Sequence, residues 1–277
     1  MPETGALEVR NLKFEVGPGV PRFWHGGRRS VTAFFNNLSV FFPPGERFFI
    51  ASVKAHRDHV DDDPVLAELA RGFYAQEGIH SREHVRYNAM LREQGYPVED
   101  MEERVTRLLR RVSRRAPLRM QLAVTAALEH FTALMAHVLL SDDRLLEGAH
   151  PVMAGLWRWH AAEENEHKAV AFDVFRAAGG TYRERVAAMI GATVIFWAKV
   201  IEHQVRLMKV DRTLFSPGEW WALAKFLFIT PGGLRKVIPH YFTYFRPSFH
   251  PWDLDNRDLL EAWKRELTSS PVYDTAA

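Results

Sequence analysis

The chain has 277 residues, of which 47% are hydrophobic and 25% are charged, and its formal net charge is +2. This length can bury a sizeable core in one large domain, and the near-neutral charge without a long Lys/Arg run argues against nucleic acid as a partner. The chain contains no cysteine, which excludes disulfides, iron–sulfur clusters, thiolate zinc sites and a cysteine nucleophile. Any metal must therefore be bound by histidine and carboxylate side chains.

The N-terminal part is expected to form an irregular arm followed by helices. Residues 1–29 carry scattered glycines, prolines and charges and are assigned to the arm, and residues 30–277 are assigned to a single helical domain. Apolar residues from Ser30 to Phe42 predict a helix that Pro43-Pro44-Gly45 ends, and the next helix is expected to open at Glu46.

Proline and acidic or hydroxyl caps mark the later helices. Asp63 before Pro64 is a strong helix start, and Thr181 with Glu184 and Ser216 with Glu219 have the spacing of capping boxes. Helices are expected at residues 64–95, 97–115, 117–140, 151–178, 181–210, 216–229 and 257–268, and the aromatic, proline-rich residues 239–253 are expected to be irregular. No strand alternation and no repeat is found, so the predicted fold class is all-α.

Neither a secretory signal nor a membrane span is expected. The first residues lack a positive stretch followed by an apolar core. The longest apolar run, Val186 to Ala198, is shorter than the ~18–20 residues that cross a bilayer, and it is interpreted as a buried bundle helix. The expected location is the cytoplasm.

Two of the predicted long helices carry a Glu-x-x-His pair. On the helix that begins at Pro151, His160, Glu164 and His167 fall within a roughly 60° arc, because each helical residue turns by about 100°. Glu77 and His80 form the second pair, on the helix that begins at Pro64.

Single glutamates on two further helices complete a known ligand pattern. Glu46 opens one helix, and Glu129 lies in the apolar stretch of another, where a carboxylate is costly unless it is paired or metal-bound. The order Glu, Glu-x-x-His, Glu, Glu-x-x-His over four helices is the ligand set of carboxylate-bridged dinuclear bundles, in which four carboxylates neutralise two divalent ions. The predicted metal ligands are Glu46, Glu77, His80, Glu129, His160, Glu164 and His167.

A helical domain with surface Glu and His is the competing interpretation, since one Glu-x-x-His pair is common on solvated helix faces. Glu163 and Glu166 point away from the arc of Glu164 and are assigned to a supporting or solvent-facing role. His84 shares the face of Glu77, either as a partner of the site or as a core histidine.

The chain resembles three known families through different residues. The ligand set resembles the ferritin-like di-iron superfamily, which implies a ferritin-like four-helix bundle at about residues 46–178, with additional N- and C-terminal helices, the latter with the aromatic segment at residues 181–277. His160, four residues before Glu164 and on the same helix as the Glu164–His167 pair, resembles the additional histidine of the arylamine N-oxygenases. Over nearly the whole length the chain resembles the bacterial family described as predicted metal-dependent hydrolases, through FPPGERF at Phe42–Phe48 and YFRPSFHPWD at Tyr244–Asp253.

The resemblance implies a cofactor of two iron ions, with manganese or zinc as alternative metals. Glu46, Glu77 and His80 would hold mainly one iron, the other four predicted ligands mainly the second, and Glu77 and Glu164 would bridge. The implied function is a non-haem dinuclear iron oxygenase that uses dioxygen to hydroxylate or N-oxygenate a small organic substrate. It requires an external electron donor, since no dinucleotide-binding glycine motif follows a strand.

Other functions and partners remain open at this point. A dinuclear metal-dependent hydrolase, named by the family description, and a ferritin-like oxidase without organic substrate are the alternatives. The aromatic C-terminal third, which includes Trp220, Trp221 and Phe228, is expected to pack against the bundle. Docking to a membrane surface or to a second subunit in a homodimer is the weaker alternative for this segment.

Overall fold

The architecture is helical throughout the described part of the chain. The computed structural model describes residues 6–61, 63–269 and 273, and within them no β-strand forms, although His25 and Ala149 make one isolated bridge. The predicted all-α bundle is therefore confirmed. The helices are α1 (Arg29–Lys54), α2 (Pro64–Glu93), α3 (Val98–Arg115), α4 (Leu118–Ser141), α5 (Pro151–His167), α6 (Val170–Ala177), α7 (Tyr182–Val210), α8 (Pro217–Phe228), α9 (Gly233–Thr243) and α10 (Arg257–Ser269).

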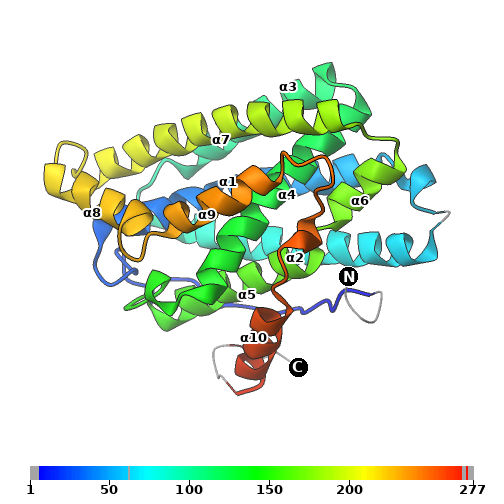
Figure 1. Ribbon diagram of the computed structural model, residues 1–277. Helices are drawn as coiled ribbons and strands as arrows, with labels where there is room; N and C mark the ends of the chain where they lie inside the picture. Colours follow the sequence, from blue (N-terminus) through cyan, green and yellow to red (C-terminus); the bar gives the residue numbers. More distant parts are fainter. Residues whose placement is uncertain (1–5, 62, 270–272, 274–277) are drawn as a thin grey trace.

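Four long helices form the centre of the molecule. Helix α1 packs against α2 and α4, and α5 packs against the same two helices from the opposite corner. Helix α7 covers α4 and α1 from outside, and α8 and α9 pack on each other beside it (Figure 1). Figure 1 shows α7 along one edge of the molecule and α10 at the opposite edge. The central four helices are the ones that carry the predicted ligands.

The N-terminal arm is extended and is part of the core. Residues 6–28 contain no helix, yet Leu12, Phe14 and Trp24 are almost fully buried. The arm lies against α2, where the backbone N–H of Phe14 donates a hydrogen bond to Glu83 Oε2 at 3.1 Å. Removal of the arm would therefore expose apolar core and take one hydrogen-bond donor away from the buried carboxylate of Glu83.

The expected helix break at Pro43-Pro44-Gly45 is wrong, because α1 continues through both prolines. A proline inside a helix removes one backbone hydrogen bond, and for Pro43 the carbonyl that loses its partner is that of Ser39. The side-chain amide of Asn88 on α2 donates to this carbonyl at 3.2 Å. A tertiary contact thus supplies the bond that the proline removes, and Glu46 lies within a continuous helix.

Two further boundaries differ from the prediction. The helix expected at 151–178 is interrupted at Lys168 and Ala169, where the ammonium of Lys168 donates to the backbone carbonyl of Leu254 and to Asn256. Part of the segment expected to be irregular is helical, because α9 extends to Thr243 with Pro239 inside it. Pro239 lies on the exposed side of α9, where water can hydrate the carbonyl that it leaves without a donor.

The interpretation of residues 186–198 as a buried helix is also wrong. Helices α4 and α7 are both long and apolar enough to cross a membrane by length and composition, but 72% of the α4 segment is buried against 28% of the α7 segment. On α7, Met189 and Val200 face the bundle, whereas Ile190, Val194 and Ile195 are exposed. Helix α7 thus has more apolar residues than its inner face can bury.

Candidate metal centre

The structure brings all seven predicted ligands together in the centre of the four-helix bundle. They come from α1, α2, α4 and α5, and none has more than 3% of its surface exposed. Their role as ligands stays a prediction, but their convergence is a property of the fold. The residues are Glu46 on α1, Glu77 and His80 on α2, Glu129 on α4, and His160, Glu164 and His167 on α5.

The donor atoms form three overlapping groups, each within 4.8 Å. One consists of Glu46, His80 and His160, one of Glu77, His80 and Glu164, and one of Glu77, Glu129 and His167. Residues 77 and 164 lie between the two outer groups, as expected for bridging carboxylates. His160 differs from the sequence-based assignment, because its imidazole lies beside the carboxylate of Glu46 and the imidazole of His80 and not in the group with Glu129 and His167.

Glu164 connects the two ends of the cluster. Its Oε1 lies 3.0 Å from Nε2 of His160, and its Oε2 lies 3.8 Å from Nε2 of His167. Nε2 of His167 also lies 3.1 Å from Oε1 of Glu77 and 3.6 Å from Oε2 of Glu129. These nitrogens nevertheless lack hydrogen-bonding alignment with any described acceptor. The imidazoles and carboxylates thus face a common centre rather than one another.

Buried donor atoms without partners show that the cluster fits metal ions. Both carboxylate oxygens of Glu46, of Glu77 and of Glu129 have no hydrogen-bond partner among the described residues. A buried carboxylate without a partner is costly, and so is a buried imidazole nitrogen. Carboxylate and imidazole donors together suit iron, zinc or manganese, so two divalent ions would satisfy these atoms at once.

A hydrogen-bonded chain fixes the tautomer of His160. The amide nitrogen of Asn88 donates to Glu102 and to the backbone carbonyl of Ser39, so its oxygen accepts from the Ser39 hydroxyl at 2.8 Å. That hydroxyl therefore accepts from Nδ1 of His84 at 2.9 Å, and Nε2 of His84 accepts from Nδ1 of His160 at 2.9 Å. The remaining nitrogen of His160, Nε2, carries a lone pair that faces the cluster.

The other two imidazoles are oriented in the same way. Nε2 of His80 donates to Oε2 of Glu163 at 2.9 Å, which leaves Nδ1 as the free nitrogen. The amide nitrogen of Gln76 donates to Glu166, so its oxygen accepts from Nδ1 of His167 at 2.9 Å and leaves Nε2 free. Each imidazole thus has one nitrogen held by a neighbour and one directed at the cluster, as in metal-bound histidines.

Arg10 of the N-terminal arm joins these two supports. Its guanidinium donates to both oxygens of Glu166, at 2.8 and 2.9 Å, and to Oε1 of Glu163 at 3.3 Å. Burial alone would lower the pKa of Arg10, but the two carboxylates outweigh burial and raise it. One buried cation therefore holds the two carboxylates that position His80 and, through Gln76, His167.

The pKa values of the cluster carboxylates diverge. Burial raises the pKa of Glu46 and of Glu129 well above the usual value, and the nearby carboxylates of Glu77 and Glu164 raise both further. Burial acts on Glu164 in the same direction, but the imidazoles of His160 and His167 outweigh it and hold the pKa of Glu164 well below the usual value. The metal-free cluster therefore retains protons that a metal ion would displace.

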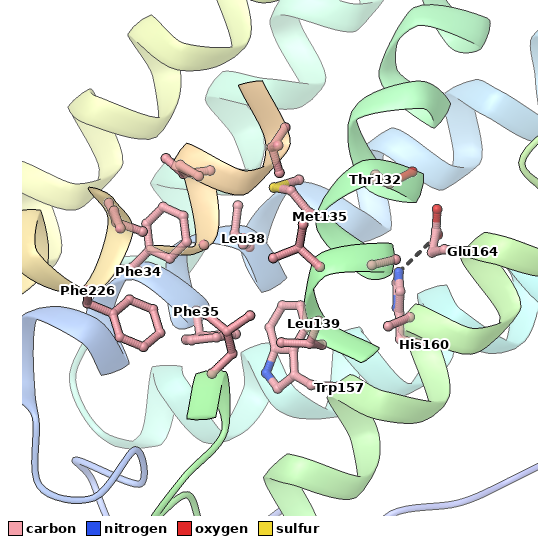
Figure 2. Close-up of a pocket in the computed structure, with 18 of the residues that line it drawn as sticks. Phe34, Phe35, Leu38, Thr132, Met135, Leu139, Trp157, His160, Glu164 and Phe226 are labelled. Carbon is pink, nitrogen blue, oxygen red and sulfur yellow. Dashed lines mark ion pairs between the residues drawn. The ribbon is translucent and has the colours of Figure 1, made fainter. Parts of the chain in front are cut away.

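An apolar cavity reaches the cluster from one side. Its volume is about 80 Å³, and it is lined by His160 and Glu164 at one end and by Phe34 and Phe226 at the other. Figure 2 shows the His160–Glu164 pair at one end of this cavity and Trp157 below its middle. The cavity gives a small apolar molecule a place next to the cluster.

Sequence reasoning missed most of the supporting residues. Arg10 lies in a segment assigned to an irregular arm, and Gln76 and Asn88 show no spacing that marks them. The available signal was on α2, where Gln76 precedes Glu77 and His84 follows His80 by one turn. For Glu163 and Glu166 the sequence predicts a supporting or a solvent-facing role, and the structure confirms the supporting one, because both are buried hydrogen-bond acceptors beside the ligand arc.

The fold and the site define a helical-bundle protein with a buried carboxylate–histidine cluster suited to metal ions. Residues 8–255 match the family described as predicted metal-dependent hydrolase, and the chain belongs to that family. No curated protein and no solved structure matches the chain. The family description thus supports a metal-dependent enzyme, without naming the metal.

Proposed function

We propose that the chain is a non-haem dinuclear iron oxygenase that acts on a small apolar substrate. The observation that carries this proposal is the donor set: four buried glutamates and three buried histidines on four helices, with unpartnered atoms facing a common centre. This is the ligand pattern of dinuclear carboxylate proteins built on helical bundles. Glu46, His80 and His160 would hold one ion, Glu129 and His167 the other, and Glu77 and Glu164 would bridge.

The protein's own residues would hold the metal ions, orient the imidazoles and shield the substrate from water. When bound, two iron ions supply the activation of dioxygen, with electrons from an external donor. Glu163, Gln76 and His84 fix the orientation of the three imidazoles, and the apolar cavity keeps water away from a substrate beside His160. The apolar lining selects for an aromatic or aliphatic substrate over a charged one.

Hydrolysis is the second candidate, and the family description favours it. The same residues would then hold zinc or manganese, which would supply activation of water for the hydrolysis of an ester or amide. The cavity gives little support to a polar substrate, since apart from His160, Glu164 and Thr132 it is lined almost wholly by apolar residues. The helical donor set is the reason for placing oxygen activation first.

Metal analysis combined with dioxygen uptake separates these functions. About two iron ions per chain, and reductant-dependent uptake of labelled dioxygen into an aromatic amine or alkyl-chain substrate, would support the oxygenase. Zinc or manganese with hydrolysis of alkyl esters and no dioxygen use would overturn it in favour of the hydrolase. Dioxygen reduced to water without an oxygenated product would overturn it in favour of a ferritin-like oxidase.

A further inference from the structure

Helices α7, α8 and α9 expose a continuous apolar surface. Each helix exposes large apolar side chains. The most exposed are Val194 on α7 at 66%, Trp221 on α8 at 62% and Phe242 on α9 at 62%. We call this surface the α7–α8–α9 face and define it by Val194, Ile201, Trp221, Phe228, Ile238 and Phe242. Phe215, in the turn between α7 and α8, adds a ring that is 93% exposed. Apolar patches of this kind on a folded chain mark an interaction surface.

A groove joins the three helices into one surface. It has a volume of about 440 Å³, and Ile201 of α7, Phe228 of α8 and Ile238 of α9 line it together. The hydroxyls of Thr193 and Tyr241 hydrogen-bond at 2.9 Å and tie α7 to α9 beside the groove. Three of the six residues that define the face therefore line a single depression, one from each helix.

The charges around this face are mainly positive. Residues 186–252 contain eight Lys and Arg but three Asp and Glu. Each of the three acids is engaged within the protein: Glu202 pairs with Lys199, Asp211 pairs with Arg22, and Glu219 accepts from the backbone of Ser30. The exposed cations include Lys209, Arg212, Lys225 and Arg235. An apolar surface with exposed tryptophan and a basic rim complements the interface of an anionic bilayer.

We propose that the α7–α8–α9 face docks onto the surface of an anionic lipid bilayer. The apolar side chains enter the boundary between headgroups and acyl chains, and the basic residues contact the lipid headgroups. Helix α7 then lies along the membrane rather than across it. Its charged residues Lys199, Glu202 and Arg206 would be costly inside the bilayer, and its inner face packs on α4 and α1. Basic residues near an anionic surface each strengthen binding severalfold.

The groove on this face lies next to the cavity beside the cluster. Phe34, Leu227, Leu234 and Val237 line both the surface groove and the inner cavity that ends at His160. A shift of these side chains would therefore open a route for an apolar molecule from the bilayer towards the cluster without crossing water. This route rests on the proposed function, whereas docking itself depends only on the exposed face.

Vesicle flotation with the full chain tests the docking. The protein is expected to float with vesicles of phosphatidylcholine containing one quarter phosphatidylglycerol, and to float much less with pure phosphatidylcholine or at high salt. The double variant Trp221→Glu with Phe242→Glu should lower the partition coefficient about tenfold or more, and Lys225→Glu should lower it about fivefold or more. Val65→Glu, an exposed apolar position on α2, is the control and should bind as the wild type.

Two outcomes would overturn the proposal. The first is equal, weak recovery of the wild type and the double variant with both kinds of vesicle. The second is a wild-type dimer in lipid-free solution that the double variant converts to a monomer without any vesicle binding, since a second copy of the chain would then cover the face. Circular dichroism and metal content of the variants show whether the fold is retained, so a misfolded variant is replaced by the single variant Trp221→Glu.

Discussion

At the centre of the bundle, carboxylates and imidazoles are buried without partners, whereas on α7, α8 and α9 aromatic and aliphatic side chains are exposed. Both arrangements are the reverse of what favours folding in water. The centre is rigidly built, since a hydrogen bond from a neighbouring residue orients each imidazole. The geometry of the outer face comes mainly from helix packing, with a hydrogen bond between Thr193 and Tyr241 that ties α7 to α9.

The difference between the rigid centre and the apolar outer face indicates that each region binds a different kind of partner. A cluster of fixed donor atoms is specific for ions of defined charge and geometry. An apolar face with a basic rim is tolerant of shape and suits a fluid, anionic surface. The following experiments test whether the two regions serve these separate purposes, beginning with the change that should have the largest effect.

Removal of a bridging carboxylate should empty the cluster. Glu77→Ala or Glu164→Ala is expected to abolish binding of both metal ions, because each carboxylate lies between the two outer donor groups. Metal content by elemental analysis after gel filtration measures this effect. Glu68→Ala is a matched control, since Glu68 is an exposed glutamate on α2 that pairs with Arg71. Full metal content in either bridging variant would refute the assignment.

The convergence of the seven predicted ligands could be anticipated from the sequence, but several parts of their surroundings could not. The offsets between Glu77 and His80 and between Glu164 and His167 are local, and helical periodicity alone places each pair on one face. The continuation of α1 through Pro43 was not predictable, because it depends on Asn88, which lies on another helix. The role of Arg10 depends in the same way on two carboxylates more than 150 residues away.

The outer face shows the same limit of prediction. An apolar run of the length found in α7 is equally compatible with a buried helix and an exposed one, and which side is covered depends on the neighbouring helices. Helices α4 and α1 contact the inner side of α7, where Met189, Val200 and Leu207 are buried, whereas Ile190, Val194 and Ile201 on its other sides are exposed. Pattern alone therefore assigned α7 to the interior.

Loss of Arg10 should weaken metal binding without removing a ligand. Arg10→Met leaves Glu163 and Glu166 buried without their cation and loosens the orientation of His80 and of Gln76. Substitutions of this kind typically lower metal affinity about 10- to 100-fold. Competition with a chelator of known affinity measures the change.

Arg22→Met is the control for this experiment. Arg22 also anchors the N-terminal arm through an ion pair, but its partner is Asp211 at the end of α7. If both variants lose metal equally, the effect comes from the arm as a whole and not from the support of the imidazoles.

Glu129→Gln should change how the metal-free protein responds to pH. The pKa of Glu129 is raised in the folded state, so its contribution to stability is full at low pH and is lost as the pH rises through the raised pKa. Between the ordinary glutamate pKa of about 4.3 and that raised value, the variant should gain about 1.4 kcal/mol per pH unit relative to the wild type.

Thermal unfolding of chelated protein between mildly acidic and neutral pH measures this difference. A gain of 1.4 kcal/mol corresponds to about 3–6 °C in Tm for a domain of this size. Glu68→Gln is the control, because its carboxylate is exposed to water in the folded chain. A constant difference in Tm over this range would show that Glu129 is already ionised in the metal-free fold.

The smallest effect is expected on metal binding when the α7–α8–α9 face is changed and the central cluster is left intact. Trp221→Glu with Phe242→Glu changes two exposed residues that line neither the groove nor the cavity beside the cluster. Exposed substitutions away from packed features usually change stability by no more than about 0.5 kcal/mol each, so metal content and chelator-measured affinity should equal those of the wild type. Independence of this kind, together with lost vesicle binding, would assign docking to the outer face and metal binding to the centre. A fall in metal affinity of tenfold or more would instead show that α8 and α9 hold the bundle in its metal-binding geometry, and that the exposed rings act on the cluster through the core.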